Sequence, residues 1–94
     1  MLTSKQRATL RGMANGLDTL FQVGKEGLGD AFFKQVDGAL EARELIKLRV
    51  LETSMLAAGE AAQQIAAQCG AEVVQVIGSR FVLYRPSKEK RIKV

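Results

Sequence analysis

The chain of 94 residues is 47% hydrophobic and carries a formal net charge of +4. This length corresponds to one domain with a single core, and no apolar run approaches the ~20 residues that would span a bilayer. The N-terminal segment MLTSKQRATLRGM has basic side chains but no apolar block behind them, so we expect no signal peptide. These features predict a cytoplasmic protein.

The composition also bears on the class of function. The sequence contains no histidine and a single cysteine, so the usual general base and metal ligand is absent and an internal disulfide is excluded. The carboxylates show no paired or metal-ligand spacing, and no Walker or Rossmann glycine pattern occurs. We therefore expect a protein that is not an enzyme and has no cofactor or metal.

The excess positive charge lies at the C-terminal end. The last ten residues, RPSKEKRIKV, hold five basic side chains against one acidic one, whereas residues 1–84 are balanced. A basic tail is most often solvated, but in a nucleic-acid-binding protein it can also follow phosphates, and we expect some of both. The charge favours a polyanionic partner.

The first half of the chain predicts a helix, a strand and a second helix. A capping-box pattern at Thr3 precedes a helix over about residues 4–15, which an Asn-Gly pair ends. Residues 18–24, DTLFQVG, are rich in strand formers and end at glycine. Asp30 opens the second helix, whose apolar side chains share one face: Phe32, Phe33, Val36 and Leu40.

Three strands are predicted in the second half. Residues 44–51, ELIKLRVL, alternate in the manner of a half-buried strand, with Lys47 and Arg49 on the same side. The segments EVVQVIG and RFVLYR form a hairpin around the two-residue turn Gly78–Ser79. Pro86, the only proline, ends the last strand.

A third helix is predicted between these strands. Thr53 or Ser54 is expected to cap it, and Gly70 to end it. Its buried stripe is expected to comprise Met55, Ala58, Ala62, Ile65, Ala66 and Cys69. A thiol on such a stripe is expected to be structural and not reactive.

The element order predicts an α/β fold of the form α-β-α-β-α-β-β, in which helices pack on a mixed four-stranded sheet. Two βαβ crossovers imply parallel strands with right-handed connections, and the final hairpin adds an antiparallel strand. We expect one domain over residues 1–87, followed by a basic C-terminal tail over residues 88–94.

A glycine-flanked loop follows the first predicted strand: Gly24, Lys25, Glu26 and Gly27. Glycines at both ends allow a ligand to approach the backbone, and the N-terminus of the following helix favours an anion. Glu26 counts against phosphate binding, and glycine also serves strand-to-helix turns for geometry alone. The loop is therefore open to both a phosphate-binding and a structural interpretation.

Further basic residues could extend such a site. Lys5, Arg7 and Arg11 make the first helix purely basic, and like charges four residues apart destabilise an isolated helix slightly. A bound anion would offset this repulsion, although the arginines could equally be solvated and cover the core with their stems. Lys47 and Arg49 are the next candidates, followed by Arg80 and Arg85.

Three segments together resemble the YhbY family, the bacterial stand-alone members of the CRM (chloroplast RNA splicing and ribosome maturation) domain. They are LTSKQRATLRGMANGLDTLFQVGKEGL, ALEARELIKLRVL and VVQVIGSRFVLYRPS, and they span Leu2 to about Ser87. The resemblance implies an RNA-binding domain with a fold similar to the C-terminal domain of translation initiation factor three. It maps the family's GXXG loop onto residues 24–27 and implies association with precursors of the large ribosomal subunit.

The sequence is compatible with two functions. The first is a monomeric RNA-binding protein that recognises backbone and shape, since the aromatic residues are too few for a broad base-stacking platform. The alternative is a protein-interaction module that docks an assembly or ribosomal protein, with a purely structural glycine loop. Tyr84 could face a base, a partner or the core.

Overall fold

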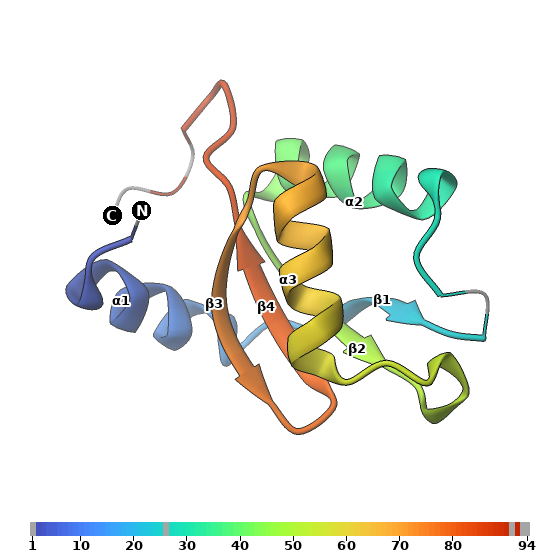
Figure 1. The fold of residues 1–94 in the computed structure, drawn as a ribbon. Helices are drawn as coiled ribbons and strands as arrows, with labels where there is room; N and C mark the ends of the chain where they lie inside the picture. Colours follow the sequence, from blue (N-terminus) through green and yellow to red (C-terminus); the bar gives the residue numbers. More distant parts are fainter. Residues whose placement is uncertain (1, 26, 91, 93–94) are drawn as a thin grey trace.

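The computed structural model describes residues 2–25, 27–90 and 92. In these ranges the chain forms the predicted order of elements, drawn in Figure 1: α1 (Ser4–Ala14), β1 (Thr19–Val23), α2 (Asp30–Arg43), β2 (Leu45–Val50), the short 3₁₀ turn η1 (Glu52–Ser54), α3 (Ala58–Cys69), β3 (Glu72–Ile77) and β4 (Arg80–Tyr84). None of the described helices combines the length and apolarity needed to cross a membrane.

The four strands form one mixed sheet in the order β1-β2-β4-β3. β1 is parallel to β2, and β4 is antiparallel to both β2 and β3, so β1, β2 and β3 run in the same direction. The predicted mixed sheet is thus confirmed. Because the three parallel strands end at the same edge, the loops after them gather there: Leu51 N–H donates to Val23 O at 2.9 Å, and Val50 N–H donates to Ser79 O at 2.8 Å.

Helices cover the two faces of the sheet unequally. α2 and α3 pack on one face around a large core that includes Val36, Leu40, Leu48, Ile65 and Phe81. α1 packs on the other face through a smaller cluster of Leu10, Ala14, Leu45, Val74, Val82 and Tyr84. Tyr84 is therefore a core residue, 5% exposed. A single short helix leaves part of its face uncovered.

The start of the third helix was predicted wrongly. Neither Thr53 nor Ser54 caps α3, whose N-cap is Ala57. The Ser54 hydroxyl donates to Leu51 O and accepts from Leu56 N–H, which closes a short turn instead. Met55 then adopts a left-handed conformation with φ 62° and is 90% exposed. α3 begins at Ala58 without a side-chain cap. The other predicted members of the buried stripe are buried, and Gly70 ends the helix at φ 66°.

The C-terminal segment is attached to the body by a buried carboxylate. Glu44, the residue after α2, is fully buried. Its Oε2 accepts hydrogen bonds from the backbone N–H and the hydroxyl of Ser87 at 2.8 and 2.6 Å, and its Oε1 accepts from Ile92 N–H at 2.6 Å. Lys88 N–H donates to Glu41 Oε2 at 3.0 Å. Part of the predicted tail, residues 91, 93 and 94, lies outside the described residues.

Candidate nucleic-acid interface

α1 leaves one end of its sheet face open. The helix covers Leu45 and Tyr84, but the side chains nearer the carboxyl ends of the parallel strands project beyond it, because alternate residues share a face. We call this surface the open face. It comprises Gln22, Lys47, Arg49, Gln75, Ile77 and Arg80.

Two arginines lie opposite each other on this face. Arg49 on β2 and Arg80 on β4 are direct partners in the antiparallel register. Arg49 is half-buried and Arg80 is exposed. Like charges directly opposite each other destabilise a sheet, and among the described residues neither arginine is ion-paired with a carboxylate. The pair thus creates a site at which an anion would relieve an existing repulsion.

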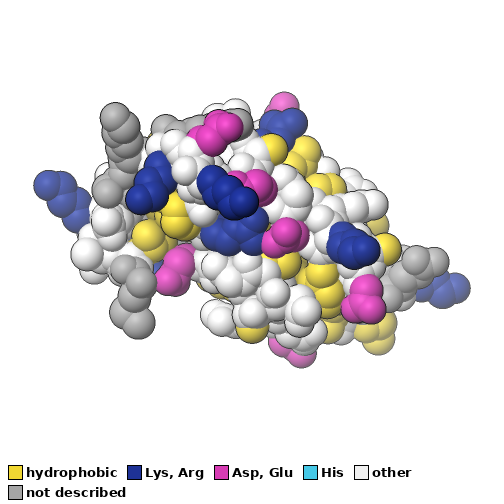
Figure 2. Space-filling view, turned by 90° about the horizontal axis from the view of Figure 1, so that it is seen from above, with side chains coloured by type: hydrophobic (Ala, Val, Ile, Leu, Met, Phe, Trp, Pro, Cys, Tyr) yellow, Lys and Arg dark blue, Asp and Glu magenta, His cyan; other side chains and the backbone are white. Residues whose placement is uncertain are grey.

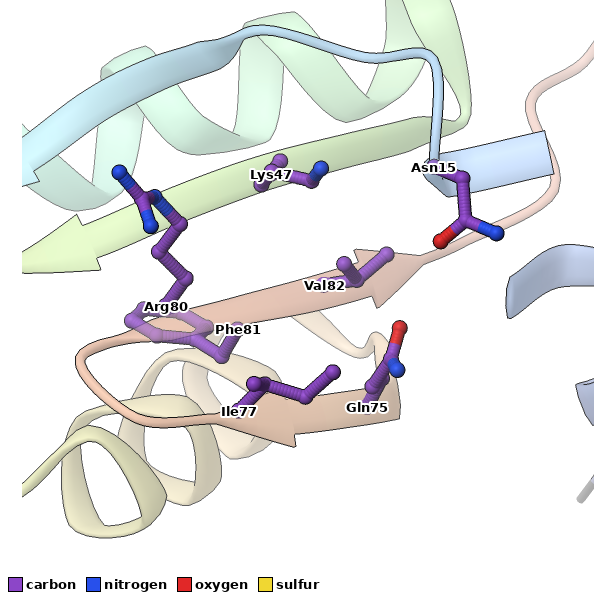
Figure 3. Close-up of a pocket in the computed structure, with 7 residues that line it drawn as sticks. All are labelled: Asn15, Lys47, Gln75, Ile77, Arg80, Phe81 and Val82. Atoms are coloured by element: carbon purple, nitrogen blue, oxygen red, sulfur yellow. The ribbon is translucent and has the colours of Figure 1, made fainter. Parts of the chain in front are cut away.

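Beside the arginine pair the face is hollowed (Figure 3). The hollow has a volume of about 130 Å³ and is lined by Asn15 at the end of α1, Lys47 of β2, Gln75 and Ile77 of β3, and Arg80, Phe81 and Val82 of β4. Arg80 and Lys47 extend along its β2 side, whereas the carboxamides of Asn15 and Gln75 lie at its α1 end. Sequence reasoning missed both amides; a glutamine inside an apolar strand was the available signal.

The glycine loop continues the same edge of the sheet. Val23 pairs with Val50, so the loop begins at Gly24, two residues beyond the row that holds Gln22, Arg49 and Arg80. Gly27 N–H donates to Gly24 O at 2.9 Å, and Gly27 has φ +70°, a conformation that favours glycine. Lys25 is exposed. Glu26 of the predicted site lies outside the described residues.

α2 starts directly after this loop. Its N-cap is Gly29, which provides no side-chain hydrogen bond to the helix. The first N–H groups of a helix have no partner within the helix, and they carry the positive end of its dipole. Lys25, the loop backbone and this helix end could therefore approach one anion from the same side.

The basic residues of α1 lie elsewhere. In Figure 1, α1 and the glycine loop lie at opposite ends of the molecule, whose longest dimension is 35 Å. Lys5 and Arg11 are exposed, and the half-buried Arg7 lines a groove along the outer edge of β3. One phosphate cannot contact both regions, whereas an extended polyanion could follow the sheet from one to the other.

Arg85 points away from the open face and is engaged within the protein. Its guanidinium bonds Asp37 Oδ1 at 2.5 Å and Cys69 O at 2.9 Å, and lies 3.7 Å from Glu41 Oε1. The side chain is 18% exposed. Figure 2, a view from above the orientation of Figure 1, shows basic and acidic side chains intermingled on the upper surface of the molecule. Arg85 thus ties β4 to α2 and α3, and we omit it from the candidate interface.

The single thiol lies in this structural region. Cys69 is buried, its Sγ–H points to Phe33 O at 3.8 Å, and burial raises its pKa, with a further increase from Asp37 and a decrease from Arg85. A thiol with a raised pKa is a poor nucleophile. Among the described residues no cluster of acidic and thiol ligands could hold a metal ion.

These features define a small α/β domain that presents cations on an open sheet face. Residues 2–85 match the model of the CRS1 / YhbY (CRM) domain, and the chain belongs to this family. The Bacillus subtilis protein named "Probable RNA-binding protein YqeI" is 44% identical over 91 residues, which cover 97% of this chain and 95% of that protein. A Haemophilus influenzae protein named "RNA-binding protein" is 33% identical over 93 residues, 99% of this chain and 94% of that one.

The fold has a solved counterpart as well. A Staphylococcus aureus protein, described as hypothetical and as a candidate RNA-binding protein, has a solution structure that matches with a TM-score of 0.77 at 42% identity. The match covers 97% of this chain and 95% of that one. The predicted family membership and the predicted α/β order of elements with a mixed four-stranded sheet are both confirmed.

Proposed function

We propose that this protein binds RNA through the open face and the glycine loop, as a monomer, and that it acts without catalysis on precursors of the large ribosomal subunit. The observation that carries the proposal is the register of Arg49 directly opposite Arg80, with no carboxylate paired to either among the described residues. The names of the relatives support RNA as the polyanion. The ribosomal assignment rests on the resemblance of the three sequence segments.

Arginine suits the task because its planar guanidinium can bind a phosphate through two N–H groups. Arg49 and Arg80 lie on neighbouring strands, and Lys47 lies two residues before Arg49 on β2. Together they provide cationic side chains that could contact successive phosphates. The glycine loop adds Lys25 and backbone N–H groups at the same edge of the sheet. RNA would then extend from this loop across the open face toward the basic flank of α1.

The test is a titration of RNA with a double variant, Arg49→Gln with Arg80→Gln, over a range of salt concentrations. The affinity should fall roughly tenfold, and the slope of log affinity against log salt should decrease by about one to two, because phosphate contacts release counterions. The matched control is Lys34→Gln with Lys88→Gln, which removes the same charge from exposed positions elsewhere. Equal losses in both variants would mean that only net charge matters and would contradict the proposed site.

The cellular partner needs a separate experiment. Sedimentation of cell lysate at low and high salt should show salt-sensitive enrichment of the protein on immature large subunits. Absence from every ribosomal fraction would leave RNA binding in place and remove the ribosomal part of the proposal.

One observation favours the alternative, a protein-docking module. Val76 and Ile77, at the end of the edge strand β3, are 43% and 63% exposed, and Met55 is 90% exposed. Exposed apolar side chains at a sheet edge are typical of protein contacts. If they dominate, capture of a ribosomal or assembly protein should persist at high salt and should not depend on Arg49 or Arg80.

A further inference from the structure

The hollow on the open face differs in chemistry from the arginine pair beside it. Its two cations, Lys47 and Arg80, lie on the β2 side, and the amides of Asn15 and Gln75 lie at the α1 end (Figure 3). Phosphate binding alone gives no reason for two amides. An amide offers both a donor and an acceptor, the combination that matches the edge of a nucleobase.

A β-bulge places Gln75 in this hollow. Val73 pairs with Leu83, but Gln75 pairs with Val82, so β3 contains one extra residue at this point. With regular pairing, Gln75 would lie opposite Phe81, on the face covered by α2 and α3. The bulge instead directs Gln75, and Ile77 after it, to the open face. Bulges often re-aim a side chain beside a functional site.

Neither amide is committed to a structural bond. Among the described residues, the side chains of Asn15 and Gln75 make no hydrogen bond to the rest of the protein. Asn15 is exposed at the C-terminal end of α1 and Gln75 is half-buried on β3. Both groups are therefore available to a ligand that enters the hollow.

The remaining walls are apolar. Val82 forms the floor between the cations and the amides, and Ile77, 63% exposed, borders the β3 side. A flat aromatic ring could rest on Val82 and against Ile77 while its edge meets the amides. The volume of about 130 Å³ is small, so it suits one ring system and not a stack of bases.

We propose that this hollow binds one unpaired nucleobase of the RNA, with Asn15 and Gln75 on its edge, Ile77 against its face, and Lys47 and Arg80 on the flanking phosphates. The inference rests on the RNA binding proposed above and adds the kind of RNA: one with a single-stranded or bulged nucleotide. RNA sequence is read mainly at such unstacked positions, whereas phosphate contacts fix orientation.

The test compares three hairpin RNAs: one fully paired, one with a single bulged nucleotide, and one with an abasic residue at the bulge. The wild-type protein should bind the bulged RNA roughly tenfold more tightly than the abasic one, since the abasic RNA lacks the base that the hollow would hold. The variant Asn15→Ala with Gln75→Ala should lose this preference but keep the wild-type salt slope. Ile77→Ser should weaken binding of the bulged RNA alone.

The matched control is Gln64→Ala with Gln68→Ala, which removes two exposed amides from α3 and should preserve the preference. Equal wild-type affinity for all three RNAs, with a normal salt slope, would overturn the nucleobase site and leave the proposed RNA binding intact. Failure to bind any of the three at low salt would overturn both.

Discussion

The buried carboxylate of Glu44 accepts two hydrogen bonds from Ser87, one from its backbone N–H at 2.8 Å and one from its hydroxyl at 2.6 Å. These residues are 43 positions apart, and their contact fastens the segment after β4 to the end of α2. Ile92 N–H donates to the same carboxylate. Hydrogen bonds to a carboxylate are stronger than those between neutral groups, so the loss of this acceptor is costly.

Replacement of Glu44 is therefore expected to destabilise the fold. Glu44→Ala leaves buried donors without an acceptor and should lower the free energy of unfolding by about 2–4 kcal/mol. Glu44 also has φ 67°, so Glu44→Gly should cost less by roughly 1 kcal/mol, because glycine tolerates that backbone. Urea unfolding of the three proteins measures the differences. Equal stability of wild type and Glu44→Ala would contradict the anchoring role.

The free energy of unfolding is expected to depend on pH in the alkaline range because of Tyr84. Burial raises its pKa above the ordinary value near 10, and the nearby Glu44 raises it further. Because the folded-state pKa is higher than the unfolded one, the stabilising contribution of the protonated phenol is complete below about pH 10 and is lost as the pH rises through the folded-state pKa.

This dependence can be measured directly. Tyr84 is the only tyrosine, so the phenolate absorbance reports this group alone, and its midpoint should move down when the protein is unfolded in urea. Tyr84→Phe should reduce the loss of stability above pH 10, whereas the contribution of Cys69, whose pKa is also raised, should remain. Identical midpoints in native and urea-unfolded protein would refute the shift.

The two glycines of the loop should respond differently to alanine. Gly27 has φ +70°, so Gly27→Ala should destabilise the protein by about 1 kcal/mol through backbone strain. At Gly24 an added Cβ would lie 3.7 Å from Leu51 Cδ1, an ordinary contact, and the fold should tolerate it.

Gly24→Ala is therefore the cleaner probe of ligand approach. Its thermal stability should remain near wild type while RNA affinity falls several-fold, because the new methyl group obstructs a phosphate at the backbone. Melting temperature and RNA titration on the same samples separate the two effects. Unchanged affinity in Gly24→Ala would favour a purely structural loop.

Some features of the fold and of the candidate site can be predicted from the sequence, and others cannot. The alternation in ELIKLRVL correctly places Lys47 and Arg49 together on one strand face, because side-chain direction in a strand depends only on the neighbouring residues. Their meeting with Arg80 depends on strand register, which is set by long-range pairing. The bulge that turns Gln75 outward and the bond from Glu44 to Ser87 arise in the same way. Met55 was wrongly predicted to lie on the buried stripe of α3, because Ser54 closes a local turn instead of capping the helix.

Arg80 begins β4 and Arg85 directly follows it, but replacing them is expected to change stability in opposite directions. Arg85 bridges Asp37, Glu41 and the Cys69 carbonyl, so Arg85→Gln should lower the free energy of unfolding by about 1–2 kcal/mol. Its RNA affinity, measured at a temperature where the variant remains folded, should stay within about twofold of wild type. A large loss of affinity without loss of stability would return Arg85 to the RNA-binding surface.

Arg80→Gln should instead stabilise the free protein. Removal of one charge relieves the repulsion from Arg49 across the strand pair, a gain of roughly 0.2–1 kcal/mol that added salt should diminish. The same variant should bind RNA several-fold more weakly, since the repulsion is what a phosphate would neutralise. Urea unfolding at low and high salt, together with RNA titration, tests both statements. A variant that is less stable than wild type and binds RNA equally well would show that Arg80 supports the sheet and not the ligand.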